Sequence, residues 1–123
     1  MSKRRDTLLF FHHPTCSTCK QAARWLAEHD VAVAAHPIAT TPPTASQIED
    51  AITRSGLPLK RFFNTSGQSY RGGGWADKVD GLSLREASEA LAADGMLIKR
   101  PLLIRHDVVL VGFKPDAYAA ALG

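Results

Sequence analysis

The only two cysteines of the chain, Cys16 and Cys19, stand three positions apart in the stretch PTCSTCKQ. Two thiols at this spacing can form a disulfide within one turn of a helix. The apolar residues that follow have helical spacing, which places Cys16 in the turn before a helix. Unpaired N–H groups at a helix N-terminus stabilise a thiolate, and the thiolate is the nucleophile in thiol chemistry. The pattern therefore predicts Cys16 as the reactive thiol and Cys19 as its redox partner.

Two other interpretations of the cysteine pair remain open, and one of them involves the nearby histidines. A C-x2-C pair is half of a zinc site, which His12, His13 or His36 could complete. The sequence has no second C-x2-C and no H-x3-5-H pattern, so we favour a redox pair and expect no metal. The third interpretation is two small residues buried at a helix start. In the redox interpretation, His12 orients or deprotonates a thiol if the turn brings it close.

The elements that must position the thiols form a strand–helix–strand unit. We expect a buried strand at Thr7–Phe11, a helix at Thr18–Glu28 capped by Ser17 or Thr18, and a second strand at Val31–Pro37. This order requires a parallel pair of strands joined by a crossover. A C-x-x-C motif beside such a unit is typical of a thioredoxin-like fold.

The middle of the chain is predicted to be mostly helical. A capping box at Thr44 opens one helix to about Ser55, stopped by Gly56, and a second box at Ser83 opens another to about Ala93, stopped by Gly95. Between them, the glycine-rich stretch NTSGQSYRGGGW predicts a loop.

The last part of the chain is predicted to contain a hairpin and a helix. Strands at Leu102–Ile104 and Val108–Val111 are separated by the turn RHD. The final helix begins at Pro115 and turns Ala117, Tyr118, Ala121 and Leu122 to one face. We therefore predict one α/β domain over residues 1–123, with a four-stranded mixed sheet flanked by helices. A helical insertion of about residues 40–98 separates its βαβ and ββα halves.

The composition indicates the class of protein and the cellular compartment to expect. The chain has 123 residues, of which 45% are hydrophobic and 22% charged, as in ordinary globular proteins. It lacks a secretory signal pattern and an apolar run long enough for a membrane helix, so we expect a cytoplasmic protein with reduced thiols. The net charge is only +3, and we interpret the basic cluster Lys3–Arg5 as a solubility feature rather than a nucleic-acid site.

Three stretches together resemble the ArsC/Spx family, which comprises glutaredoxin-coupled arsenate reductases and Spx/MgsR-type regulators. They are HPTCSTCKQAARWL, LPLKRFFNTSGQSYR and DGMLIKRPLLI, the last followed by LVGFKPDAY. The resemblance implies a thioredoxin-like fold with a helical insertion. It also implies that Cys16 is the catalytic cysteine, that His12 favours its thiolate, and that Arg100 binds an oxyanion before a cis Pro101.

Two departures separate the chain from the arsenate reductases it resembles. Those enzymes hold the oxyanion with three arginines, but this chain has Asn64 at the position of the first and only Lys114 near that of the third. Arg61 or Arg71 could replace the missing charge. Those reductases also commonly lack the second cysteine, because glutathione supplies the second thiol, whereas Cys19 gives this chain its own.

We therefore expect an enzyme, an arsenate reductase-like thiol–disulfide oxidoreductase with a Cys16/Cys19 redox pair. It needs no bound cofactor, its partner is a thiol reductant such as glutathione, glutaredoxin or thioredoxin, and we expect a monomer. The alternative is an Spx-type redox-sensing transcription regulator that binds the C-terminal domain of the RNA polymerase α subunit. The retained His12, and the lack of the charged tail such regulators usually carry, favour the enzyme.

Overall fold

The computed structural model describes residues 7–122, so the basic cluster Lys3–Arg5 lies outside the described residues. The chain divides into two compact units. One, here called the sheet unit, combines Met1–Pro37 with Arg100–Gly123, and the other, the helical unit, is Ile38–Lys99. The helical unit covers the segment predicted as an insertion. The single domain over residues 1–123 stays a prediction.

The sheet unit contains the predicted four-stranded mixed sheet. Its strands are β1 (Leu8–His12), β2 (Val33–Pro37), β3 (Leu102–Arg105) and β4 (Val108–Val111), in the order β2-β1-β3-β4. β1 pairs in parallel with β2, whereas β1–β3 and β3–β4 are antiparallel pairs. β1 ends one residue later than predicted and therefore includes His12. The β3–β4 turn consists of two residues, as expected for a tight hairpin.

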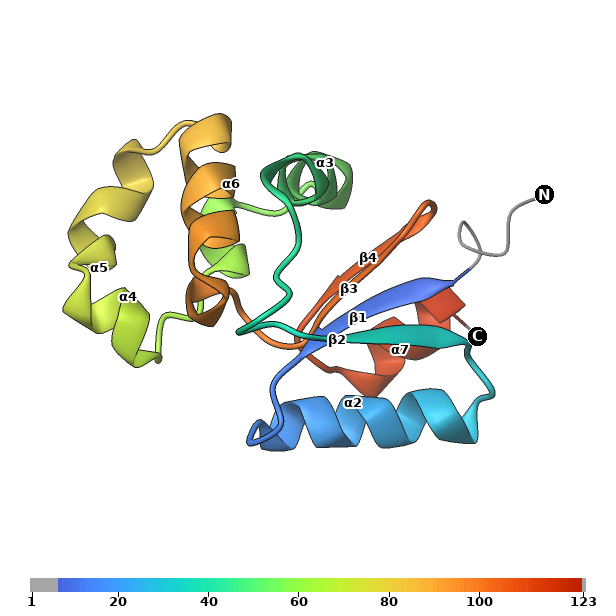
Figure 1. Cartoon of the computed structure of the whole chain (residues 1–123). Helices are drawn as coiled ribbons and strands as arrows, with labels where there is room; N and C mark the ends of the chain where they lie inside the picture. The colour runs from blue at the N-terminus through green and yellow to red at the C-terminus, as the bar shows by residue number, and fades with distance from the viewer. Residues whose placement is uncertain (1–6, 123) are drawn as a thin grey trace. The chain divides into compact units, whose positions relative to one another are not determined.

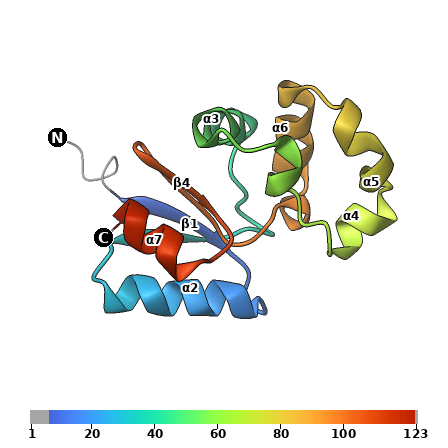
Figure 2. The ribbon, with the colours of Figure 1, turned by 180° about the vertical axis from the view of Figure 1, so that it is seen from behind.

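Two helices, α2 (Ser17–Glu28) and α7 (Pro115–Leu122), lie on the same face of the sheet in Figures 1 and 2. Strand side chains alternate between faces, so every second residue of β1 and β3 points at these helices. The core between them consists of Leu8, Phe10, Ala22, Leu26, Leu103 and Tyr118. The predicted inner face of α7 is half wrong, because Ala117 and Ala121 are exposed and Tyr118 fills the space.

The helical unit is built on the two predicted capped helices, α3 (Ala45–Ser55) and α6 (Leu84–Ala93). In each, the N-cap hydroxyl accepts the N–H three residues on, and the side chain of that residue accepts the N-cap N–H. Each box satisfies two backbone N–H groups that the helix itself leaves without partners. Local sequence therefore fixes where both helices begin.

The segment after α3 contains more helix than predicted. A 3-10 turn, η1 (Leu59–Phe62), precedes α4 (Gln68–Gly72), α5 (Trp75–Lys78) and a second 3-10 turn, η2 (Val79–Gly81). The predicted loop is therefore wrong over α4, whereas α5 begins only at its last residue, Trp75. Burial overrides the glycine signal here, because the ring of Tyr70 packs 6.1 Å from that of Phe63 and holds α4 in place.

Gly95 does not act as the predicted helix stop. α6 ends at Ala93 with Asp94 as its C-cap, and Gly95 opens a further 3-10 turn, η3 (Gly95–Leu97). Gly95 is buried, and a Cβ atom there would collide with the carbonyl oxygen of Ile38. The glycine is thus required for a close backbone approach rather than for a left-handed turn.

Within residues 7–122, no helix combines the length and the apolar character needed to cross a membrane.

Candidate functional site

The loop between β1 and α2 is held by the ring of His13. Nδ1 of His13 accepts the N–H of Thr15 at 3.2 Å and lies 2.9 Å from its hydroxyl oxygen. A backbone amide can only donate, so Nδ1 is the acceptor in its contact with the N–H of Thr15. The carbonyl of His13 in turn accepts the N–H of Cys16 at 3.1 Å. His13 is thus a structural residue that sets the position of Cys16 at the end of the loop.

Cys16 is itself the N-cap of α2, so the predicted caps Ser17 and Thr18 are wrong. Its backbone is extended (φ −85°, ψ 111°), and its Sγ accepts the N–H of Cys19 at 3.2 Å. The sulfur therefore takes the place that a cap hydroxyl normally occupies, facing the amides of the first turn. A negative charge on Sγ is favoured there by these amides and by the helix dipole.

Cys19 lies in a different environment one turn further on. It is 3% exposed, whereas Cys16 is half-buried, and both thiols are free. Burial raises the pKa of Cys19 from 9.0 to about 12, helped by the hydrogen bond and the charge of Cys16. The backbone of His13 and the charge of Arg100 oppose this rise without cancelling it. Cys19 is therefore a protonated thiol at neutral pH.

Arg100 precedes Pro101 at the start of β3, and the bond between them is cis, as the resemblance implied. The side chain is half-buried in the sheet unit. Its positive charge lowers the pKa of Cys19, so the structure brings the guanidinium into the electrostatic range of the thiol pair. Binding of an oxyanion by Arg100 stays a prediction.

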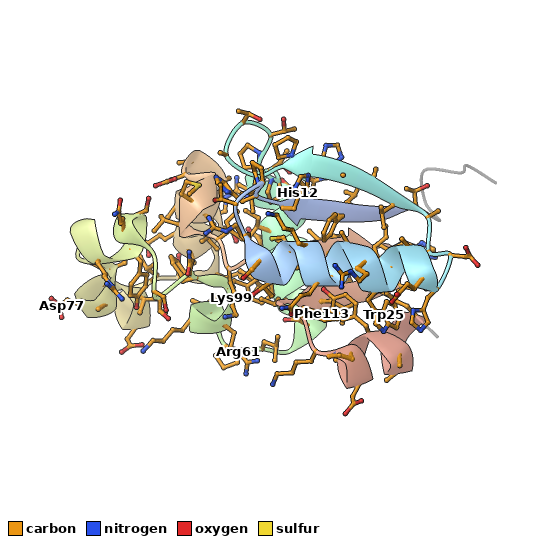
Figure 3. All side chains as sticks on the ribbon, turned by 90° about the horizontal axis from the view of Figure 1, so that it is seen from below. His12, Trp25, Arg61, Asp77, Lys99 and Phe113 are labelled. Carbon is orange, nitrogen blue, oxygen red and sulfur yellow. The ribbon has the colours of Figure 1, made fainter. Side chains whose placement is uncertain are left out.

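His12 ends β1 and is labelled in Figure 3. Its ring stacks on that of Phe10, with 5.4 Å between the centroids. Burial lowers the pKa of His12, and the neighbouring His13 and His36 lower it further, so the imidazole is neutral at neutral pH. Among the described residues, no hydrogen bond joins His12 to Cys16. A neutral ring favours a thiolate by accepting its proton, and this role also stays a prediction.

A hollow of about 240 Å³ adjoins the buried thiol and is lined mainly by apolar atoms. Its walls include Phe10, His12, His13, Cys19, Lys20 and Ala35. We call it the thiol hollow. It brings His12 to the same space as Cys19.

The other predicted residues are distributed over both units. Arg61 in η1 and Arg71 in α4 are exposed side chains of the helical unit, and Lys114 is exposed before α7 in the sheet unit. Asn64 occupies a turn of the helical unit, where its side-chain amide nitrogen lies 2.7 Å from the point at which a Cβ on Gly67 would stand. Within residues 7–122, no three His, Cys, Asp or Glu side chains gather as a metal site would require.

Tyr118 interacts electrostatically with Cys19, and the sequence did not predict this interaction. Its hydroxyl donates a hydrogen bond to the carbonyl of Gly112 at 2.6 Å, and Trp25 and Phe113 meet its ring edge-on. Burial raises the pKa of Tyr118, and the charge of Cys19 raises it further. No sequence signal could have revealed this, because the link exists only once α7 folds back onto α2.

The comparisons with known proteins agree on one family. Residues 11–121 match the model of the ArsC family. The chain is 44% identical over 112 residues to the uncharacterised protein YusI of Bacillus subtilis, covering 91% of this chain and 95% of YusI. It is also 25% identical to the global transcriptional regulator Spx of Streptococcus agalactiae, covering 94% of this chain and 82% of the regulator.

A solved structure supports the fold. The chain is similar to a crystal structure from Streptococcus mutans described as a possible arsenate reductase, with 47% identity and a TM-score of 0.84. The match covers 89% of this chain and 92% of the other. The mixed sheet and its helices are therefore the thioredoxin-like fold of ArsC proteins.

Proposed function

The chain belongs to the ArsC family, and on that premise we propose that it is a thiol–disulfide oxidoreductase in which Cys16 attacks and Cys19 resolves. The observation that carries the proposal is the unequal environment of the two sulfurs. Cys16 Sγ is half-buried at the N-terminus of α2 and accepts an amide hydrogen bond, whereas Cys19 is 3% exposed. The thiol open to substrate is thus also the one placed to carry negative charge.

In the first step, the thiolate of Cys16 attacks one sulfur of a substrate disulfide. A bond forms between Cys16 Sγ and that sulfur, the substrate disulfide breaks, and the other half leaves as a thiolate. The amide of Cys19 remains directed at Cys16 Sγ and fixes its approach. The product of this step is a mixed disulfide on Cys16.

In the second step, Cys19 loses its proton and attacks Cys16 Sγ. The substrate leaves as a thiolate, so it has gained two electrons and the pair has become a disulfide. A charged Cys16 is one of the causes that raise the pKa of Cys19. Since Cys16 is uncharged in the mixed disulfide, that cause disappears and Cys19 ionises more readily after the first step than before it. Loss of the charge on Cys16 thus favours the second step once the first is complete.

Alkylation tests the assignment of the two thiols. At mildly acidic pH, a limiting amount of iodoacetamide should label Cys16 first, as mapped by peptide mass spectrometry, because Cys19 is buried and protonated. The variants Cys16→Ser and Cys19→Ser serve as matched controls, each leaving a single thiol. Equal labelling of both cysteines, or preference for Cys19, would show that Cys16 is not the more reactive thiol.

Equilibration with glutathione buffers tests the redox pair. We expect a reversible Cys16–Cys19 disulfide with a potential in the range of roughly −180 to −300 mV found for thioredoxin-like proteins and their cellular reductants. Glutathione, glutaredoxin or thioredoxin would then return the pair to the dithiol. Failure to form an intramolecular disulfide across this range would contradict the resolving role of Cys19.

Arsenate is a substrate of the proteins that this chain resembles, but we expect its turnover here to be weak or absent. The reason is Asn64, which brings no charge where those enzymes place an arginine. Removing one stabiliser of developing charge typically costs about 10²–10³ in rate. Asn64→Arg should raise arsenate activity if charge is the only defect, and Arg100→Ala should abolish it while exchange with a small disulfide persists. Efficient arsenate reduction by the wild type would show that another cation replaces the arginine.

The second candidate is a redox-sensing regulator of the Spx type. It is supported by the similarity to Spx over 94% of this chain, and a Cys16–Cys19 disulfide would serve as its switch. Pull-down with the C-terminal domain of the RNA polymerase α subunit, comparing the oxidised and reduced protein, separates the two functions. Redox-dependent capture favours the regulator, and turnover of a disulfide without capture favours the enzyme.

A further inference from the structure

The helical unit contains a hollow of about 220 Å³ in which three cations converge. It is lined by Lys60, Arg61, Phe63, Thr65 and Lys99, and we call it the basic hollow. Figure 3 labels Arg61 and Lys99, which lie near one another although 38 positions apart in the chain. The lining contains no acidic residue.

Backbone pairing holds the two segments that form the basic hollow. The N–H of Lys99 donates to the carbonyl of Phe62 at 2.9 Å, and the N–H of Asn64 donates to the carbonyl of Leu97 at 2.7 Å. Phe63 and Ile98 form the bridge between these bonds, and each is 1% exposed. The cations therefore project from a buried, hydrogen-bonded base rather than from a free loop.

The positive charge of the basic hollow is not neutralised by its own unit. Arg54 pairs with Asp50 at 2.8 Å, and Arg85 pairs with Glu49 and Glu89 at 3.3 and 3.5 Å. Among residues 7–122, no carboxylate pairs with Lys60, Arg61 or Lys99. Three like charges around one small space repel one another, and a bound anion removes that repulsion.

We propose that the basic hollow binds a doubly charged oxyanion, a phosphate or the phosphoryl group of a small molecule. The guanidinium of Arg61 can pair with two oxygens at once, and each lysine supplies a compact charge. The hydroxyl of Thr65 adds a neutral donor. The volume is below the roughly 300–1,000 Å³ of pockets that enclose whole drug-sized ligands, so it fits the anionic group rather than a large molecule. None of these residues takes part in the two steps proposed for Cys16 and Cys19.

Amide chemical shifts measured by NMR on the full chain provide the test. Inorganic phosphate and glycerol 3-phosphate are titrated separately at constant ionic strength, with acetate as a singly charged control. We expect saturable shifts at the amides of Arg61, Thr65 and Lys99 with both phosphates, and weaker binding of acetate. The tighter phosphate shows whether the site takes the free anion or a phosphoryl group on a larger molecule. Acetate binding as tight as phosphate would overturn the proposal.

Variants connect the shifts to the basic hollow. Lys99→Ala removes one charged donor while keeping the backbone bond to Phe62, so the affinity for phosphate should fall about tenfold. Lys78→Ala removes the same charge from an exposed position of the same unit outside the lining, and should leave the affinity unchanged.

Two results would overturn the proposal: an equal loss of affinity in Lys99→Ala and Lys78→Ala, or shifts that do not saturate. Thermal melts establish that both variants are folded. Alkylation of Cys16, measured on the same samples, should be unchanged by either substitution. Failure of the phosphate site is thereby distinguished from failure of the thiol chemistry.

Discussion

The sheet unit and the helical unit differ in which ionisable side chains they bury. In the sheet unit, His12, Cys19 and Tyr118 have pKa values shifted mainly by burial, each towards its uncharged form. In the helical unit, only Glu86 has a clearly shifted pKa among the described residues, and it is exposed and lowered by the capping box. The sheet unit thus desolvates three ionisable groups but keeps Asp107 in water, where Arg105 lowers its pKa, and the shifted group of the helical unit is also in water.

The difference shows which interactions each unit can support. Buried groups in the sheet unit respond strongly to the charge of a neighbour, because the local dielectric constant is low. That sensitivity suits the proposed thiol pair, in which Cys19 ionises after Cys16 has reacted. A single exposed cation in the helical unit is screened by water and salt, so it attracts an anion only weakly. Several cations around one space attract an anion more strongly, which suits anion recognition.

The largest effect expected from this contrast is the loss of thiol chemistry in Cys16→Ser. A serine can still cap α2 but cannot act as the attacking thiolate, so exchange with a small disulfide should fall by roughly 10³-fold or more. Stopped-flow absorbance measures the rate. Lys99→Ala in the helical unit is the control and should not change it. Substantial exchange in Cys16→Ser would show that Cys19 is the nucleophile and would contradict the assignment of the two thiols.

Truncation of the helical core should change stability rather than chemistry. Leu91 on α6 is fully buried, and Leu91→Ala should lower the free energy of unfolding by about 2–5 kcal/mol. Urea denaturation measures the change. Leu84→Ala, at a half-buried position of the same helix, should lose less. Equal losses for the two variants would contradict the assignment of Leu91 to the core.

The buried thiol should make stability depend on alkaline pH. The pKa of Cys19 is raised from 9.0 to about 12, so its contribution to stability is complete below pH 9 and is lost as pH rises towards 12. Between about pH 8 and pH 10.5, the free energy of unfolding of the reduced wild type should fall by about 2 kcal/mol more than that of Cys19→Ala. Parallel pH profiles would mean that Cys19 ionises freely in the folded protein.

The smallest expected effect is local to α3. Thr44→Ala removes the hydroxyl that accepts the N–H of Gln47 at 3.1 Å, and should cost about 1 kcal/mol of stability. Thr41→Ala, at an exposed position before the helix, is the matched control and should have little effect. Thermal unfolding followed by circular dichroism measures both. A loss as large as that of Leu91→Ala would show that the capping box does more than begin a helix.

The sequence by itself determined the elements whose signals are local. The capping boxes of Thr44 and Ser83, the two-residue hairpin turn and the start of α7 at Pro115 follow from interactions within a few residues. The mixed sheet followed from the order of elements, and the position of Cys16 before a helix followed from apolar spacing. Recognition of the three family stretches added the cis bond at Pro101.

Only the tertiary structure decided which side chains lose water and which share a space. Nothing local indicated that Tyr70 would order the glycine-rich segment, that Gly95 faces the carbonyl of Ile38, or that Tyr118 is electrostatically linked to Cys19. The meeting of Arg61 with Lys99 was equally hidden. Each depends on contacts between segments far apart in the chain, where burial and neighbouring charge are set by packing and not by the residues on either side.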